Sequence, residues 1–474
     1  MKNKHLQLLL SVLIISQFVL AGCTELIPTG TQLVEPTLTR ATLTSTSTQQ
    51  LTENMLPTET PPVPTIAITD KLLKGLNITV RHPFYDDVEA FNQMIRDFNL
   101  NNLWGIHVTG VASGGTEGLA NDLFDGLVED DLVIGMSTDL LAAQPETQFL
   151  ALDDYARDPK FGVASYFESG SPFSELTPQF GESVHYTIPI AYNAGILLYN
   201  ETWAEELGFS RTPTDSEGLL NVAKVAMGAN QVDANYNNNG TGGLWLSQSP
   251  LSAQSWYSSF GGKFEIQENV FIPQADALLD SFNFLKTAYD ANQTWVGVEP
   301  ASYRYFSERY AVITEGSLMD FSYQAAYQTT GEFQDAWTSL SYPGSNGEST
   351  LVLEPLSVAI QISDSSSELA AWIFANWLFE PAQQARLVEI HGLWPSTGDP
   401  AAIAPDYASA YSYWATALDS DPNISVIPET ENWASVRLVF QDAYQRIYNL
   451  DAAYFSNILE VFEQTTQINR EQRN

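Results

Sequence analysis

The histidines of this chain are spaced too widely to form a recognisable catalytic or metal-binding motif. Downstream of the single cysteine they stand at positions 82, 107, 185 and 391, and no H-E-x-x-H pair occurs. The sequence therefore gives no support to a zinc hydrolase. It also contains no G-x-S-x-G or S-x-x-K nucleophile motif and no glycine-rich phosphate loop after a strand. We expect neither a metal ion nor a cofactor.

Two kinds of site stay open at this point. The asparagine-rich stretch 233–240 alternates oxygen-bearing side chains before a glycine, as the start of a calcium loop does. The twelfth position counted from Asn235 is Leu246 rather than glutamate, so a polar surface turn is the preferred interpretation, and calcium binding remains undecided. A glycosidase pair could also lie among the 57 acidic residues, because carboxylate separation is a property of the fold.

The single cysteine, Cys23, ends an apolar stretch near the N-terminus. Lys2 and Lys4 precede this stretch, and Ala21 and Gly22 stand directly before the cysteine. A lone thiol can form no internal disulfide, and the apolar run is short for a membrane span. The sequence Leu20 to Cys23 resembles the lipobox of bacterial lipoproteins. The resemblance implies a signal peptide over 1–22 and lipidation of Cys23, which would anchor the protein to the outer face of the cell membrane.

Alternating strand and helix patterns predict a parallel sheet covered by helices. The strands 76–82, 105–113 and 131–137 alternate with helices 86–99 and 118–128, whose apolar residues recur at helical spacing. Further on we expect an extended segment over 187–200 and a return strand over 310–317. Helices are predicted over 201–209, 216–230, 275–292 and 367–390, and from Trp433 onward. The segment from Thr24 to about Thr69, rich in Thr, Ser, Pro and Gln, predicts a disordered tether.

The ends of the predicted strands carry polar and aromatic side chains. Ligands of doubly wound sheets bind beyond the carboxyl ends of the strands. Taken singly, each of these residues is better explained as a turn or a cap, but together they mark one edge of a sheet. The candidates at these ends include His82, Tyr85, Ser137, Thr138 and Asp139.

The order of these elements resembles the sugar-binding lipoproteins of bacterial ABC importers, the extracellular solute-binding family that includes maltose-binding protein. The resemblance covers nearly all of residues 76–465. Its more specific parts are "IPIAYNAGILLYNETWAEELGF" and "ELAAWIFANWLFEPAQQARLVEIHGLWPST". "VEDDLVIG" departs from the glycine and Pro-Asp that relatives tend to carry before the third strand. The resemblance implies a two-lobed α/β periplasmic-binding-protein type II fold with a ligand cleft between the lobes.

The resemblance also implies further ligand-binding residues. Tyr192 and Asn193 match the crossover segment, and Ser317 follows the return strand. Trp394 lies in the proline loop and Trp433 opens the C-terminal helix, and Trp256 is a further candidate for a ring beneath a sugar. Trp372 and Trp377 lie within an apolar helix, where a core position is expected instead.

The domain division that we expect follows from the same resemblance. It has four parts, namely the signal peptide 1–22, the lipidated cysteine and tether 23–75, an N-terminal lobe of 76–190 plus 311–360, and a C-terminal lobe of 191–310 plus 361–474.

The implied function is capture of a carbohydrate, a mono- or oligosaccharide, by a monomer that delivers it to the permease of an ABC importer without changing it. The formal net charge of −37 disfavours nucleic acid as a partner, and it argues mildly against phosphates. Two alternatives stay open, namely a surface-anchored hydrolase, such as a glycosidase, and the same fold with a solute other than a sugar. Which sugar is bound and which permease is served are undecided.

Overall fold

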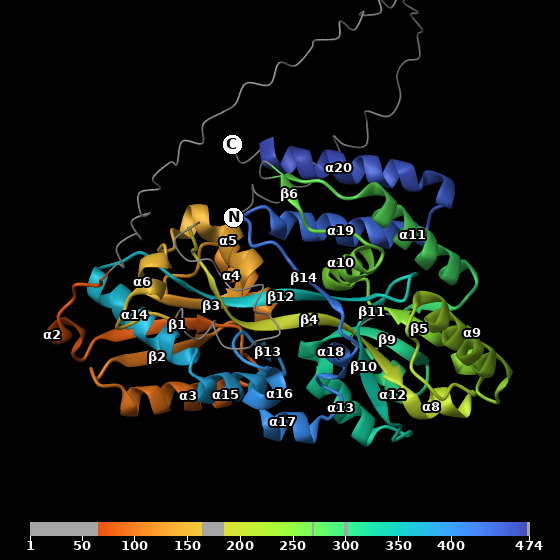
Figure 1. The fold of residues 1–474 in the computed structure, drawn as a ribbon, viewed down its shortest axis with the longest axis horizontal. Helices are drawn as coiled ribbons and strands as arrows, with labels where there is room; N and C mark the ends of the chain where they lie inside the picture. The colour runs from red at the N-terminus through yellow and green to blue at the C-terminus, as the bar shows by residue number, and fades with distance from the viewer. Residues whose placement is uncertain (1–64, 164–183, 268–269, 298–301, 472–474) are drawn as a thin grey trace, which may run out of the picture. The chain divides into compact units, whose positions relative to one another are not determined.

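The computed structural model describes residues 65–163, 184–267, 270–297 and 302–471. The expected signal peptide, Cys23 and most of the tether lie outside these residues. Within the described ranges, twelve strands form one sheet whose main order is β2-β1-β3-β12-β4-β9-β5-β8. The strands coloured orange and green in Figure 1 are joined by the long strands β4 and β12.

The sheet begins with the three parallel strands that the sequence predicts. They are β1 (Asn77–His82), β2 (His107–Ala112) and β3 (Leu132–Met136), with β1 paired to both of the others. The helix α3 (Val88–Asn101) follows β1 and buries Phe91, Ile95 and Phe98, as its periodicity predicts. The other helices of this part are α4 (Gly115–Phe124), α5 (Ser137–Thr147), α6 (Asp153–Arg157) and the short α2 (Asp70–Leu73).

Two long antiparallel strands carry the chain between the two ends of the sheet. They are β4 (Ile188–Asn200), buried along its whole length, and β12 (Ser349–Ile360). Strand β12 pairs with β3, and β4 pairs with β9 (Ala311–Ser317). The order continues through β5 (Gly242–Leu246) to β8 (Thr294–Val296), both parallel to their neighbours. We call β1 to β3 with their helices the N-terminal side, and β5, β8 and β9 with theirs the C-terminal side.

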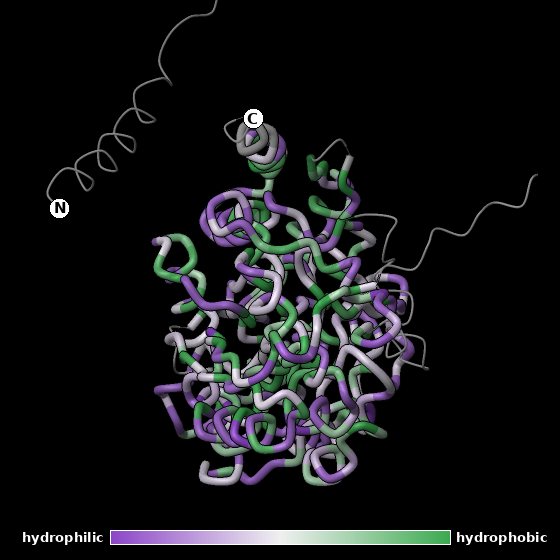
Figure 2. Tube along the Cα trace, turned by 90° about the vertical axis from the view of Figure 1, so that its left-hand side faces the viewer, coloured by the Kyte–Doolittle hydropathy of each residue, from purple (hydrophilic) through white to green (hydrophobic). Residues whose placement is uncertain are grey.

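Short strands extend the sheet at its centre. Strands β10 (Trp337–Leu340) and β13 (Trp394–Pro395) pair with β4, while β11 (Tyr342–Pro343) and β14 (Asn423–Val426) pair with β12. Strands β6 (Ile266–Gln267) and β7 (Val270–Phe271) form a separate pair. Figure 2, which colours the trace by hydropathy, shows hydrophobic stretches in the middle of the folded part.

Helices cover both faces of the sheet. The C-terminal side carries α8 (Glu201–Glu206), α9 (Ser216–Val232), α10 (Pro250–Ser259), α11 (Ala275–Asp290), α19 (Trp433–Ile447) and α20 (Phe455–Glu471). The remaining helices are α12 (Ser302–Ser307), α13 (Phe321–Thr330), α14 (Ser365–Leu378), α15 (Pro381–His391), α16 (Pro400–Ile403), α17 (Pro405–Ala410) and α18 (Thr416–Asp419), with 3₁₀ turns at Tyr236–Asn238, Leu318–Asp320 and Ala452–Tyr454. In the described part of the chain, no helix has the length and apolar character that crossing a membrane requires.

Segments that are distant in the sequence pack together on each side of the sheet. Helices α14 and α15, within 361–474, contact β1 and α3 of the N-terminal side. Strand β9, within 311–360, pairs with β5 and adds Val312 and Ile313 to the core of the C-terminal side. The division into two lobes that the sequence suggests stays a prediction.

The long helix predicted over 367–390 is two helices. Pro381 has no N–H to donate and disfavours a helical conformation for Glu380, so α14 ends at Leu378 and α15 begins at Pro381.

Candidate functional site

A cavity of about 650 Å³ lies beside the carboxyl ends of β3, β9 and β5, where the crossing strands β4 and β12 pass. Asp139 reaches it from the first turn of α5, directly after β3. Ser317 ends β9, and Trp245 lies one residue before the end of β5. Strand β3 runs opposite to β9 and β5, so the ends of strands from the two sides meet at the cavity, with β4 and β12 passing between them. The cavity therefore draws its walls from both sides of the sheet.

The floor of the cavity, which we define as Asp139, Asn193, Glu354 and Arg437, holds an ion pair between the two sides. Arg437 on α19 places Nη2 2.5 Å from Oδ1 of Asp139 on α5. Its Nη1 lies 3.2 Å from Oγ1 of Thr138 and 3.7 Å from Oε1 of Glu354 on β12. Burial raises the pKa of Asp139, and Arg437 opposes that rise. The Arg437 guanidinium is thus the partner of two carboxylates, and it lies much closer to Asp139 than to Glu354.

Glu354 stands opposite Asn193 where β12 pairs with β4. Burial raises the pKa of Glu354 to about 7; Arg437 lowers this pKa, Asp139 raises it further, and a hydrogen bond from Asn193 lowers it. The other polar atom of that amide, Asn193 Oδ1, is buried, and it accepts no hydrogen bond from the described residues. The floor therefore presents an amide oxygen and a weakly paired carboxylate.

A third buried carboxylate, Glu315 on β9, is fully engaged by protein donors. Trp256 Nε1 donates to it at 2.6 Å, and Ser247 donates from its backbone nitrogen at 2.6 Å and from its hydroxyl at 3.0 Å. Burial raises the pKa of Glu315, and these hydrogen bonds lower it. Glu315 therefore fixes the wall between β9 and the loop after β5.

Trp245 contributes an aromatic ring to the same wall. Its side chain is 1% exposed, and its Nε1 has no hydrogen-bond partner among the described residues. Tyr303 lines the cavity as well, with its hydroxyl donating to Asp320 at 2.7 Å. This nitrogen lies against Gly297, where an added Cβ would stand 2.5 Å from it, so a ligand would reach the N–H only after a local rearrangement.

Comparison with protein families gives a match over most of the described chain. Residues 106–413 match the model of the family described as bacterial extracellular solute-binding protein.

The chain belongs to this family.

Solved structures share the fold of this solute-binding protein at low sequence identity. The cyclic α-maltosyl-1,6-maltose binding protein from Arthrobacter globiformis aligns with a TM-score of 0.66 and 15% identity, covering 83% of this chain and 98% of its own. The maltose/maltodextrin-binding domain MalE from Bdellovibrio bacteriovorus, bound to maltotriose, gives 0.61 and 19%, covering 84% and 99%. UgpB from Mycobacterium tuberculosis, in complex with glycerophosphocholine, gives 0.66 and 15%, covering 83% and 98%. A search of curated proteins gave no match.

These comparisons confirm the family resemblance and the mixed α/β fold that the sequence suggests. Three of the predicted site residues of this solute-binding protein, Asp139, Asn193 and Ser317, line the cavity. Their contact with a ligand stays a prediction. Ser137 and Thr138 are buried next to Asp139, where Ser137 forms a hydrogen bond with Ser357. Tyr192 is buried in β4 beside Asn193.

The predicted tryptophan platforms lie outside this cavity. Trp394 is fully buried in β13, whose pairing with Tyr192 inserts the ring into the core. Trp433 is fully buried and donates Nε1 to Gln254 at 3.0 Å. The indole N–H of Trp256 donates a hydrogen bond to Glu315. The sequence places these tryptophans in a loop or at the start of a helix, but it does not show which elements pack over them. Their burial could therefore not be predicted.

His82 and Tyr85 also lie outside the cavity lining. His82 is fully buried in contact with Phe84 and Phe91, and burial lowers its pKa to about 4. Tyr85 is 62% exposed on the surface. Sequence reasoning missed Trp245, Glu354 and Arg437, which line the cavity. An arginine in so acidic a chain was the available signal, but its partner lies 298 residues away.

The asparagine-rich stretch 233–240 forms a hydrogen-bonded turn in the structure. In the asparagine-rich stretch, Asp233 accepts hydrogen bonds from the backbone of Asn235 and the side chain of Asn238, as a self-contained turn does. Among the described residues, no group of three His, Cys, Asp or Glu side chains could hold a metal ion.

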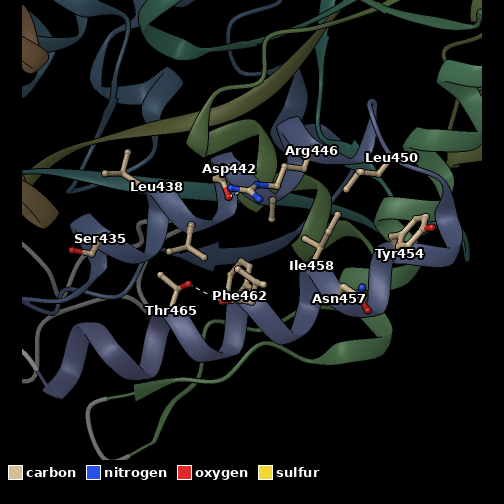
Figure 3. Close-up of a pocket in the computed structure, with 13 residues that line it drawn as sticks. Ser435, Leu438, Asp442, Arg446, Leu450, Tyr454, Asn457, Ile458, Phe462 and Thr465 are labelled. Carbon is tan, nitrogen blue, oxygen red and sulfur yellow. Dashed lines mark hydrogen bonds and ion pairs between the residues drawn. The ribbon is translucent and has the colours of Figure 1, made fainter. Parts of the chain in front are cut away.

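A second cavity, of about 610 Å³, runs between α19 and α20. Figure 3 shows Leu438, Leu450, Ile458 and Phe462 along it, with the ion pair of Asp442 and Arg446 on one wall. The side chains along it are mainly apolar and come from one helix pair. The cavity at the strand ends, with polar groups converging from both sides, is the better site for a polar solute.

Proposed function

We propose that this protein is the substrate-binding component of an ABC importer, which captures a carbohydrate in the cavity at the strand ends and hands it to a membrane permease. The observation that carries the proposal is the convergence of Asn193, Glu354 and Trp245 on one cavity from strands of both sides. A sugar offers hydroxyls that donate and accept hydrogen bonds and C–H faces that pack on rings. The fold is shared by a cyclic α-maltosyl-1,6-maltose binding protein and by a MalE domain bound to maltotriose, and both support this choice of solute.

The proposed cycle requires the two sides to close on the ligand. Contacts that a sugar makes with both sides at once favour the closed arrangement, and the permease would recognise that arrangement. Each hydrogen bond adds a net 0.5 to 1.5 kcal/mol, roughly, so several are needed for useful affinity. The protein would act as a monomer, with its two sides supplying both walls.

The proposed location is outside the cytoplasm, as for the family as a whole. We propose that diacylglyceryl modification of Cys23 anchors the protein, and that the polar segment 24–64 tethers the folded part above the membrane.

The proposal also holds that the bound sugar is not cleaved. Asp139 is paired with Arg437, and Glu315 and Asp320 accept hydrogen bonds from protein donors. A glycosidase needs one carboxyl group as a proton donor and a second as a nucleophile or base. Glu354 is paired less closely, but its neighbour Asp139 is held by Arg437, so the floor offers one available carboxyl group where this chemistry needs two.

The test is a panel of neutral and charged oligosaccharides, each added to the purified protein. We expect stoichiometric thermal stabilisation by at least one saccharide, with the same saccharide recovered intact by mass spectrometry. Native mass spectrometry of protein purified from its own host should show a co-purified ligand in the same mass range. A cleaved product, or stabilisation by no saccharide in the panel, contradicts the proposal.

A further inference from the structure

The floor of the cavity carries more negative than positive charge. Asp139 and Glu354 face one guanidinium, and Arg437 spends its shortest contact on Asp139. The remaining separation, 3.7 Å from Nη1 to Glu354 Oε1, is longer than a hydrogen bond. When both carboxylates are ionised, the floor lacks one positive charge.

The floor also carries more acceptors than donors. Asn193 Oδ1 is an acceptor without a hydrogen-bond partner in the described chain, on a residue that is 4% exposed and lines the cavity. It stands on β4 directly opposite Glu354 on β12. Hydroxyls would satisfy such a pair in part, but an ammonium group brings three donors and the missing charge together.

The walls extend the same charge pattern. Glu117, Glu315 and Asp320 line the cavity, while Arg437 is the one basic side chain among the described residues that line it. A concave site with low-polarity walls concentrates its electrostatic potential, so a cation is attracted and a carboxylate or phosphate is repelled. Trp245 and Tyr303 also line the cavity, and an aromatic face in contact with the ligand would favour a cation over a neutral group.

We propose that the floor of the cavity binds the ammonium group of an amino sugar. The ammonium would donate to Asn193 Oδ1 and to the Glu354 carboxylate, while the sugar oxygens accept from the N–H of Trp245. This inference rests on the proposed function and narrows its ligand class. It makes Glu354 the residue that selects amino sugars over neutral ones.

The experiment compares three ligand series that differ in one substituent. Oligomers of β-1,4-linked glucosamine, their N-acetylated counterparts and cello-oligosaccharides of the same length are titrated by calorimetry near pH 7, at low and at high salt. A charged hydrogen bond is worth enough for the glucosamine oligomer to bind at least about tenfold more tightly than the other two. High salt should reduce this advantage.

A matched pair of variants tests whether Glu354 causes the preference for the amino sugar. Glu354→Gln keeps the shape and removes the charge, and it should abolish the preference for the amine over the two neutral series. Glu389→Gln, an exposed residue of α15 remote from the cavity lining, removes the same charge and should leave the preference intact.

Equal or tighter binding of the N-acetylated or unsubstituted oligomers to the wild-type protein overturns the inference and leaves the proposed function standing. Binding of no saccharide from the three series or from the wider panel overturns both. The comparison of ligands on the wild-type protein needs no variant, so a folding defect in Glu354→Gln would not obscure the answer.

Discussion

Arg437 on α19 and Asp139 on α5 form an ion pair 2.5 Å long between residues 298 positions apart in the sequence. Asp139 has 6% of its side chain exposed and Arg437 has 20%, so the pair is largely removed from water. A buried charge left without its partner is strongly destabilising. This contact joins the two sides of the sheet at the cavity floor.

Replacing Arg437 with methionine should therefore lower the free energy of unfolding by about 3 kcal/mol, measured by urea denaturation. The double variant Arg437→Met with Asp139→Asn should recover part of the loss, since no charge is then stranded. Arg96→Met is the control, because its pair with Glu89 is exposed and should be worth less than about 1 kcal/mol. Equal losses in Arg437→Met and Arg96→Met would contradict a buried, structurally important pair.

Substitutions of Trp245 and Trp394 should have opposite effects on saccharide affinity and on the free energy of unfolding. Trp245→Phe removes an unpaired indole N–H from the cavity wall and should weaken saccharide binding about threefold to tenfold, with little change in the free energy of unfolding. Trp394→Phe should do the reverse, lowering stability by roughly 2 kcal/mol because it leaves a gap in the core beside β4. Calorimetry and urea denaturation on both variants give the comparison, and a binding loss confined to Trp394→Phe would reverse the assignment.

His82 should make the protein sensitive to acid. Burial lowers its folded-state pKa to about 4 from an ordinary value of 6.5, with the nearby charges of His391 and Arg81 acting in the same direction. The stability linked to His82 is therefore complete above pH 6.5 and is lost as the pH falls toward 4, because the unfolded chain binds the proton first. At pH 5 the loss amounts to about 2 kcal/mol.

His82→Phe should remove this dependence. The variant should gain stability relative to wild type as the pH falls from 7 to 5, measured by urea denaturation at each pH. Saccharide affinity should be unchanged, since His82 lies outside the cavity lining. A difference between variant and wild type that stays constant with pH would show that His82 titrates normally.

Glu354 should give amino-sugar binding its own pH dependence. Its pKa in the free protein is raised to about 7, and a bound cation stabilises the ionised form. For a ligand whose amine stays protonated across the range, affinity should therefore fall roughly eightfold between pH 7.5 and pH 6. Calorimetry on wild type and Glu354→Gln checks this, and a slope retained by the variant would point to another group.

Cys23 should decide whether the protein stays with the membrane. Cys23→Ser keeps the size of the residue and removes the sulfur that would receive the lipid. In host cells the variant should move from the membrane fraction to the soluble or secreted fraction and lose incorporation of labelled fatty acid. Membrane association that persists in the variant would contradict lipidation at this residue.

The sequence predicts local elements well because their signals are local. A few consecutive residues are enough to show the apolar spacing of α3 and the uninterrupted apolar run of β3. Asp139 was predicted from its place after the third strand, and Asn193 and Ser317 from the family resemblance; all three line the cavity.

Contacts across the fold were beyond the reach of the sequence. Trp394 is hidden by its pairing with β4, and Glu354 meets Asn193 only because β12 lies beside β4. The burial that perturbs the pKa of Glu354 is likewise a property of the assembled sheet. Residue type and position in an element could not reveal these relationships.

The antiparallel pairing of β4 with β12 has a consequence for biogenesis. Neither side of the sheet is a continuous stretch of chain, and the pairing of Asn193 with Glu354 cannot form until most of the polypeptide has been made. Topologies dominated by such distant pairings fold slowly. Slow folding keeps the newly made chain unfolded for longer. An unfolded chain is what a narrow translocation channel accepts, so this topology suits a protein that acts outside the cytoplasm.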